Sequence, residues 1–247
     1  MSLARRHRER HRAAQAGDGA LRPRDPAQPA PMPTTGPVAS EYALLLAALG
    51  QDLATLRTIQ SVERKIVAKA GMIGRYRAWL AGALAASPPV QDDIVGTMLV
   101  WAIDIADWTL ALELGDHVLA ARLALPERYK RGAAVLLAEE VAESALRVRA
   151  GVPRAVLEET LALTADHDMP DQVRAKLKKA TGLAFKAAAE AFDPNAESGV
   201  AGGKPALIRA AITQFERALA LNSTCGVKKL ITQLERELAQ AASEKAE

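Results

Sequence analysis

The sequence contains little cysteine and few aromatic residues, and both shortages limit what the chain can be. Cys225 is its single cysteine, so an intrachain disulfide is excluded and a reducing cytoplasm fits the composition. Zinc-ligand spacing is excluded as well, because the four histidines (7, 11, 117 and 167) are scattered. Aromatic residues make up only 4% of the 247 residues, so we expect a core of small aliphatic side chains, which favours close-packed helices.

Several recognisable patterns are also missing. No apolar run approaches the roughly 18–20 residues of a membrane span, and the N-terminus has no apolar secretory region. Neither GxxxxGK[ST] nor a GxGxxG after a strand occurs, so no nucleotide-binding loop is legible. Runs of β-branched residues and period-2 strand patterns are nearly absent. The sequence therefore predicts an all-α fold of antiparallel helical hairpins.

Positive charge is concentrated at the N-terminus. Residues 1–24 hold seven arginines against Glu9 and Asp18, which leaves +5 there and about −2 on the rest of the chain. Five of these arginines are closely spaced: Arg5, Arg6, Arg8, Arg10 and Arg12. Six prolines fall within residues 17–39, so we expect residues 1–39 to be a disordered basic tail and linker. Such a tail suits a polyanion such as DNA, although a solvated tail without a partner is the alternative.

The remaining chain reads as consecutive helices. Ser40 is the expected N-cap of a long first helix whose apolar face continues to Ile66. Further helices are expected near 75–86, 91–105, 107–123, 127–149, 153–166, 171–192, 205–221 and 226–242. We predict a main helical domain at 40–192, a flexible loop at 193–203 and a C-terminal hairpin at 204–247. The segment AAITQFERALALN, with Ala211, Phe215 and Ala218, resembles the second helix of a tetratricopeptide repeat.

Two groups of residues are candidates for chemistry or binding. Asp166, His167, Asp168 and Asp171 form the only cluster of acids with a histidine, which would suit a metal-dependent nuclease using Mg²⁺. The alternative is structural, with Asp168 as a helix N-cap and Asp171 in a first helical turn. In WAIDIADW, Trp101 and Trp108 could stack on bases, but their acidic neighbours favour core packing.

A second cationic group lies in the helical body. Its members are Arg57, Arg64, Lys65, Lys69, Arg75 and Arg77. They would give a rigid surface for phosphates beside the tail, or simply a solvated helix face. No residue set for a metal is predicted, and no cofactor beyond Mg²⁺ in the nuclease case.

Four segments together resemble the small terminase subunit of contractile-tailed temperate phages, a family often described as the terminase endonuclease subunit. They are an opening of the form S-x-A-R-R-H-R-x-R-H, then LRTIQSVERKIVAKAGMIGRYRAWLAGALA, QDDIVGTMLVWAIDIADWTLALEL and ALALNSTCGVKKLITQLEREL. The likeness spans nearly the whole chain. The nuclease description brings no motif that can be placed on residues here.

The resemblance implies a role in viral DNA packaging, in the cytoplasm of the bacterial host. A small subunit binds double-stranded viral DNA and presents it to the large subunit, which carries the ATPase motor. Rings are common in such subunits, and the apolar stripe from Val227 to Leu238 could support a homo-oligomer. Three hypotheses follow: a DNA-binding packaging adaptor, a DNA endonuclease in its own right, and a helical-repeat scaffold that binds only protein.

Overall fold

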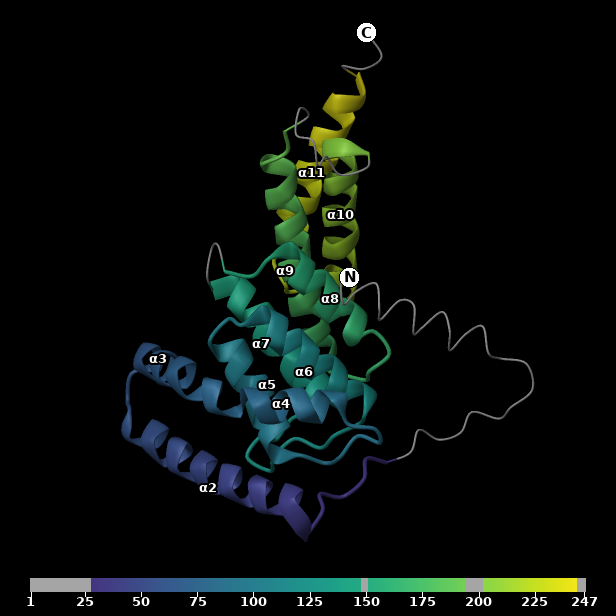
Figure 1. Ribbon diagram of the computed structural model, residues 1–247. Helices are drawn as coiled ribbons and strands as arrows, with labels where there is room; N and C mark the ends of the chain where they lie inside the picture. The colour runs from purple at the N-terminus through teal and green to yellow at the C-terminus, as the bar shows by residue number, and fades with distance from the viewer. Residues whose placement is uncertain (1–27, 148–150, 194–201, 244–247) are drawn as a thin grey trace, which may run out of the picture. The chain divides into compact units, whose positions relative to one another are not determined.

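The computed structural model describes residues 28–147, 151–193 and 202–243. Within these ranges the regular structure is helical, which confirms the all-α prediction (Figure 1). The basic residues 5–12 lie outside the described ranges. No helix in the described part is long and apolar enough to cross a membrane. The likeness of the C-terminal part to a tetratricopeptide repeat stays a prediction.

The chain forms two compact units, one up to Leu137 and one from Ala138. The first unit contains α2 (Gly36–Thr58), α3 (Val62–Met72), the 3-10 helix η1 (Ile73–Tyr76), α4 (Arg77–Ala85), α5 (Asp93–Asp104) and α6 (Trp108–Ala120). The unit boundary falls inside α7 (Ala133–Arg147). The second unit continues with α8 (Arg154–Leu163), α9 (Asp171–Glu190), α10 (Gly203–Leu221) and α11 (Lys228–Ser243).

The core of the first unit lies between α5 and α6. α5 is buried along most of its length, and Ile94, Val95, Met98 and Leu99 have no exposed surface. Gly96 allows a close approach, because a Cβ there would stand 2.8 Å from the Cδ of Pro126. A helix buried on all sides suits the continuous apolar run of this segment.

The start of the described chain packs against the first unit as a short strap, residues 28–35. The backbone amide of Ala30 donates to Pro89 O at 3.0 Å, and the amide of Gln91 donates to Ala30 O at 2.8 Å. Met32 and Pro33 line a hollow of about 340 Å³ whose opposite wall includes Trp79. Residues 28–39, which the sequence predicted as linker, are therefore packed or helical, and the backbone of Ala30 finds partners in Pro89 and Gln91.

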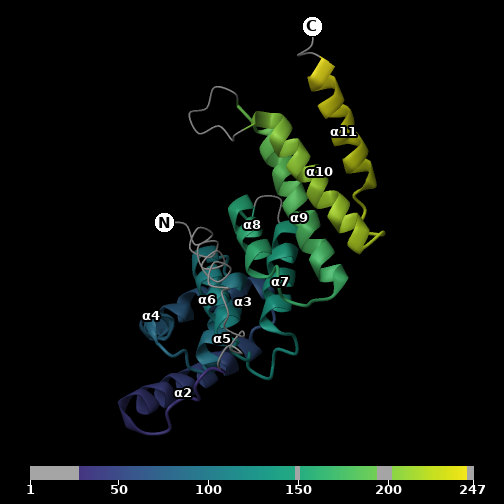
Figure 2. The ribbon, with the colours of Figure 1, turned by 90° about the vertical axis from the view of Figure 1, so that its right-hand side faces the viewer.

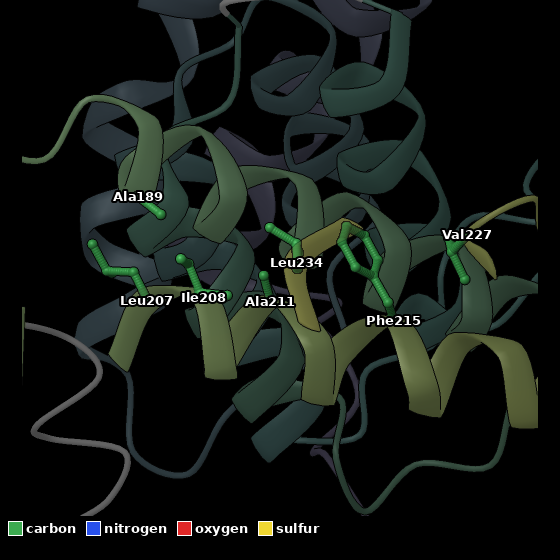
Figure 3. Close-up of a cluster of buried hydrophobic side chains, with 7 residues drawn as sticks. All are labelled: Ala189, Leu207, Ile208, Ala211, Phe215, Val227 and Leu234. Atoms are coloured by element: carbon green, nitrogen blue, oxygen red, sulfur yellow. The ribbon is translucent and has the colours of Figure 1, made fainter. Parts of the chain in front are cut away.

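In the second unit, α10 packs against both α9 and α11 (Figures 1 and 2). Their shared core, shown in Figure 3, consists of Ala189, Leu207, Ile208, Ala211, Phe215, Val227 and Leu234. Leu230, Ile231 and Leu238 pack against it from α11. In the predicted stripe from Val227 to Leu238, Val227 and Leu234 are thus buried within their own unit, and Ile231 and Leu238 are partly buried.

The first predicted helix is wrong in two respects. It begins at Gly36, with Pro37 in its first turn, and Ser40 is an internal residue whose hydroxyl donates to Gly36 O at 3.2 Å. It also ends at Thr58, and Ser61 caps a separate α3 by accepting from the amide of Arg64 at 3.3 Å. The proline was treated as a helix breaker, although a first-turn proline is tolerated because that position needs no backbone donor.

Candidate nucleic-acid interface

Six of the predicted DNA-binding residues fall within the described chain, on the elements from α2 to α4. Arg57 is in the last turn of α2, Arg64 and Lys65 are in the first turns of α3, and Lys69 is near its end. Arg75 belongs to η1, and Arg77 begins α4. The prediction that Arg5, Arg6, Arg8, Arg10 and Arg12 bind DNA lies outside the described residues.

Three of the six cations are paired with acids of the same unit. The ammonium of Lys69 lies 2.5 Å from the carboxylate of Asp104. The guanidinium of Arg77 lies 2.7 Å from the carboxylate of Asp107, which also caps α6 by accepting from the amide of Leu110. These pairs tie α3 and α4 to the two ends of the α5–α6 connection, so Lys69 and Arg77 have structural partners already.

The third pair contains the most buried acid of the three, Asp52, although Arg75 itself is about half exposed. One Nη of Arg75 donates to both oxygens of Asp52 at 3.2 Å, and the hydroxyl of Tyr76 donates to the same carboxylate at 2.6 Å. Burial raises the pKa of Tyr76 strongly, and the charge of Asp52 adds to that rise. Tyr76 therefore stays a neutral hydrogen-bond donor, and the triad fixes η1 against α2.

The other three cations, Arg57, Arg64 and Lys65, make no ion pair with a described residue. All three lie around the α2–α3 turn, and Arg57 and Arg64 are exposed. Arg64 and Lys65 stand at the N-terminal end of α3, where the helix dipole already contributes positive potential. Glu63 in the same turn offsets part of that charge. The turn therefore carries a net positive surface that suits a phosphate.

The structure separates the six predicted residues into two groups that sequence spacing did not distinguish. Two acids of WAIDIADW account for part of the difference, since Asp104 and Asp107 are the partners of Lys69 and Arg77. Trp101 in that segment is 1% exposed, which confirms its predicted core packing. Trp101 and Trp108 do not share one helix, because α5 ends at Asp104 and Ala106 takes a positive φ of 58°.

The acid–histidine cluster lies at the turn between α8 and α9. Among the described residues no group of three or more histidine, cysteine or carboxylate side chains is placed to hold a metal. The guanidinium of Arg174 donates to His167 O at 2.6 Å, which fastens the turn to α9. Asp168 does not cap the helix, since Pro170 occupies the N-cap position without a side-chain bond. Asp171 lies in the first turn, as predicted.

An aromatic cluster that sequence reasoning missed stands beside the strap. The indole N–H of Trp79 donates to Asp92 at 2.7 Å, and the ring of Tyr42 stacks on Trp79 with centroids 5.5 Å apart. Asp92 is 2% exposed and also caps α5 by accepting from the amides of Ile94 and Val95. Its oxygens are therefore occupied by protein donors, which makes Asp92 a structural residue.

Comparisons with known proteins identify the family of the chain. The model of the phage small terminase subunit family matches residues 46–172, which include α3 to α8 and most of α2. A protein of Escherichia phage P2 named "Terminase, endonuclease subunit" is 37% identical over 203 residues, covering 81% of this chain and 75% of that protein. No solved structure matches the chain. The chain belongs to the phage small terminase subunit family.

Proposed function

We propose that this chain binds double-stranded viral DNA and presents it to the large terminase subunit for cutting and packaging. The observation that carries the proposal is the α2–α3 turn, where Arg57, Arg64 and Lys65 lie without an acidic partner among the described residues. Family membership supports a terminase role for such a surface. The arginines of residues 5–12 would add phosphate contacts, which position a duplex without reading its sequence.

Duplex binding by fluorescence anisotropy over a salt series tests this proposal. In the full chain, changing Arg57, Arg64 and Lys65 to glutamine should weaken duplex binding by about 10-fold or more near 0.1 M salt. Changing the arginines at 5, 6, 8, 10 and 12 to glutamine should reduce the slope of log K against log salt by up to about 4. Both sets should melt at the wild-type temperature, because neither breaks an ion pair between described residues.

The matched control changes three exposed cations of α11, Lys228, Lys229 and Arg236, to glutamine. It removes the same number of charges and should change the affinity less than the α2–α3 variant. Equal losses in the two triple variants would contradict a dedicated surface at the α2–α3 turn. Negligible binding by the unaltered chain would favour the scaffold that binds only protein.

A second candidate function is cleavage of DNA by this chain, because the phage P2 relative is named an endonuclease subunit. Asp166, His167, Asp168 and Asp171 are the residues proposed for it, with Mg²⁺ as the metal. Incubation of the purified chain with supercoiled plasmid and Mg²⁺ tests this function. Nicking that disappears in Asp168→Asn, with the fold retained, would support it, and an intact plasmid would assign cleavage to the partner.

The partners and the site of action are part of the same proposal. We infer that the chain works with the large ATPase subunit in the cytoplasm of the bacterial host, where viral DNA is packaged. A homo-oligomer stays proposed, and the partly buried Ile231 and Leu238 are the members of the stripe from Val227 to Leu238 that remain accessible to a second copy. Light scattering of the full chain, with and without duplex and large subunit, measures both associations.

A further inference from the structure

Three cations of the second unit, Arg174, Lys178 and Arg217, have no role in the proposal above. Arg174 and Lys178 are four residues apart on α9, so their side chains share one face of that helix. Arg217 comes from α10, which packs along α9. Lys178 is half-buried and Arg217 is exposed, so the group reaches from the helix–helix seam to the surface.

The register of α9 and α10 places these residues at the same end of the pair. A Cβ added to Gly182 would stand 2.5 Å from the ring of Phe215, and a Cβ added to Gly203 would stand 3.5 Å from Phe192. The two helices therefore run antiparallel, with Gly182 opposite Phe215. Lys178 lies one turn before Gly182, and Arg217 lies two residues beyond Phe215.

The other lysines of α9 have acceptors, and this contrast isolates the cluster. Lys176 pairs with Glu139 at 3.5 Å and with Glu143 at 2.8 Å. Lys179 donates to Cys225 O at 2.7 Å, and Lys186 pairs with Glu190. An acceptor is thus the rule on this helix, whether it is a carboxylate or a backbone oxygen.

Lys178 is the exception, and its surroundings are positive. Burial lowers the pKa of Lys178, and the charges of Arg174 and Arg217 lower it further. The guanidinium of Arg174 donates only to neutral carbonyls, those of His167 and Thr164. Neither Lys178 nor Arg217 has an ion pair with a described residue. A half-buried cation that feels the charge of two guanidinium groups is unfavourable unless an anion joins them.

We propose that Arg174, Lys178 and Arg217 form a binding site for a phosphate group, which the backbone of duplex DNA supplies. The choice of DNA rests on the proposed function. Two guanidinium groups and an ammonium offer several directed donors, which match the oxygens of a phosphate better than a single carboxylate does. Such a site would give the second unit its own contact with DNA.

Inorganic phosphate tests the site itself. Thermal melting of the full chain is measured in phosphate and in chloride at equal ionic strength and pH. Phosphate should raise the melting temperature of the unaltered chain by about 2–5 °C. The double variant Lys178→Met, Arg217→Gln should lose this rise. The control Arg209→Gln, an exposed cation two turns away on α10, should keep it. An equal rise in the double variant and the control would overturn the site.

Duplex DNA tests the source of the phosphate. The double variant should bind duplex about 3- to 30-fold more weakly than the Arg209→Gln control, with a salt slope lower by about 1–2. If the double variant loses the phosphate effect on melting but binds duplex as the control does, DNA is not the ligand, and a free phosphate compound is indicated.

If the unaltered chain does not bind duplex at all, the proposed function fails, and the melting experiment still decides whether the phosphate site exists. Arg217→Gln alone, at an exposed position, repeats both arms if the double variant does not fold.

Discussion

Asp92 shows how one side chain connects three parts of the first unit. Its carboxylate caps α5 and accepts the indole N–H of Trp79, whose ring stacks on Tyr42 of α2. Burial raises the pKa of Asp92, while the hydrogen bond from Trp79 and the two α5 amides oppose that rise. The carboxylate of Asp92 thus contributes by accepting hydrogen bonds, although burial makes its negative charge unfavourable.

Replacing Asp92 by alanine should lower the free energy of unfolding by about 2–4 kcal/mol. The variant loses the helix cap and leaves the indole N–H of Trp79 without its acceptor. Urea unfolding measures the loss, and Asp93→Ala, at a neighbouring first-turn position, is the control with an expected loss below about 1 kcal/mol. Equal losses in the two variants would show that the Trp79 bond contributes nothing.

Lys178 gives a prediction of the opposite sign. Lys178→Met should raise the melting temperature by about 1–3 °C in the absence of phosphate, because it removes a charge that burial and two cations disfavour. The folded pKa lies below the unfolded value of 10.5, so the cost is complete below the folded pKa and fades as pH rises towards 10.5. Melting at pH 7 and pH 10.5 should therefore show a larger difference at pH 7. A lower melting temperature at pH 7 would contradict this account.

At this scale the sequence predicted residue type better than residue role. Cations at 57–77 were recognised as a group, but only the fold shows that Lys69, Arg75 and Arg77 face Asp104, Asp52 and Asp107. Those partners lie 23 to 35 residues away in the chain. Spacing within one segment carries no information about such distant partners.

At the scale of elements, the pair α9 and α10 depends on one close contact. Gly182 has no side chain, and the ring of Phe215 occupies the space where a Cβ would be. Phe215 itself has no exposed surface. Because the Phe215 ring is fully enclosed by neighbouring atoms, a side chain at position 182 would push α9 and α10 apart. The absence of a side chain at Gly182 therefore sets the distance between the two helices.

Gly182→Ala should therefore destabilise the chain by about 1–3 kcal/mol, even though alanine is the better helix former. Gly50→Ala in α2 is the matched control, because nothing lies within 4 Å of the added methyl group. It should be neutral or stabilising by up to about 1 kcal/mol. Hydrogen exchange should report faster exchange in α9–α11 for Gly182→Ala. A neutral Gly182→Ala would show that the ring has room to shift.

Elements with a long apolar run or a clear apolar face were predictable from the sequence. α5, α6, α9, α10 and α11 lie within a few residues of their expected ranges. The break between α2 and α3 was missed, because Ile59, Gln60 and Ser61 contain neither glycine nor proline. A serine cap can start a new helix without a breaker in front of it, and only the backbone shows that it does.

At the scale of the whole molecule, the chain has two separate hydrophobic cores, and its positive charge is concentrated in residues 1–24. Each unit has its own buried core, and both cores consist mainly of aliphatic side chains, as the 4% aromatic content predicts. The strap is the part of the molecule that sequence reasoning placed least well, since a proline-rich stretch was expected to stay unpacked.

Two truncations test the strap. A chain that starts at Gln28 keeps Ala30, Met32 and Pro33 and should melt within about 1 °C of the full chain. A chain that starts at Val38 loses both backbone bonds to residues 89–91 and one wall of the hollow. It should melt about 3–8 °C lower. Equal melting of both truncations would show that the strap does not stabilise the unit.

The two backbone hydrogen bonds that join Ala30 to Pro89 and Gln91 also attach the chain before Ala30 to the first unit at a fixed position. Arg12 precedes Ala30 by 18 residues, a distance of at most about 60 Å when fully extended. Under the proposed function, a duplex bound by Arg12 would stay within that radius of the first unit, at a local concentration on the order of millimolar. Under the same proposal, the three cations at the α2–α3 turn would need only millimolar affinity for DNA to be occupied once the arginines of residues 5–12 have bound the duplex.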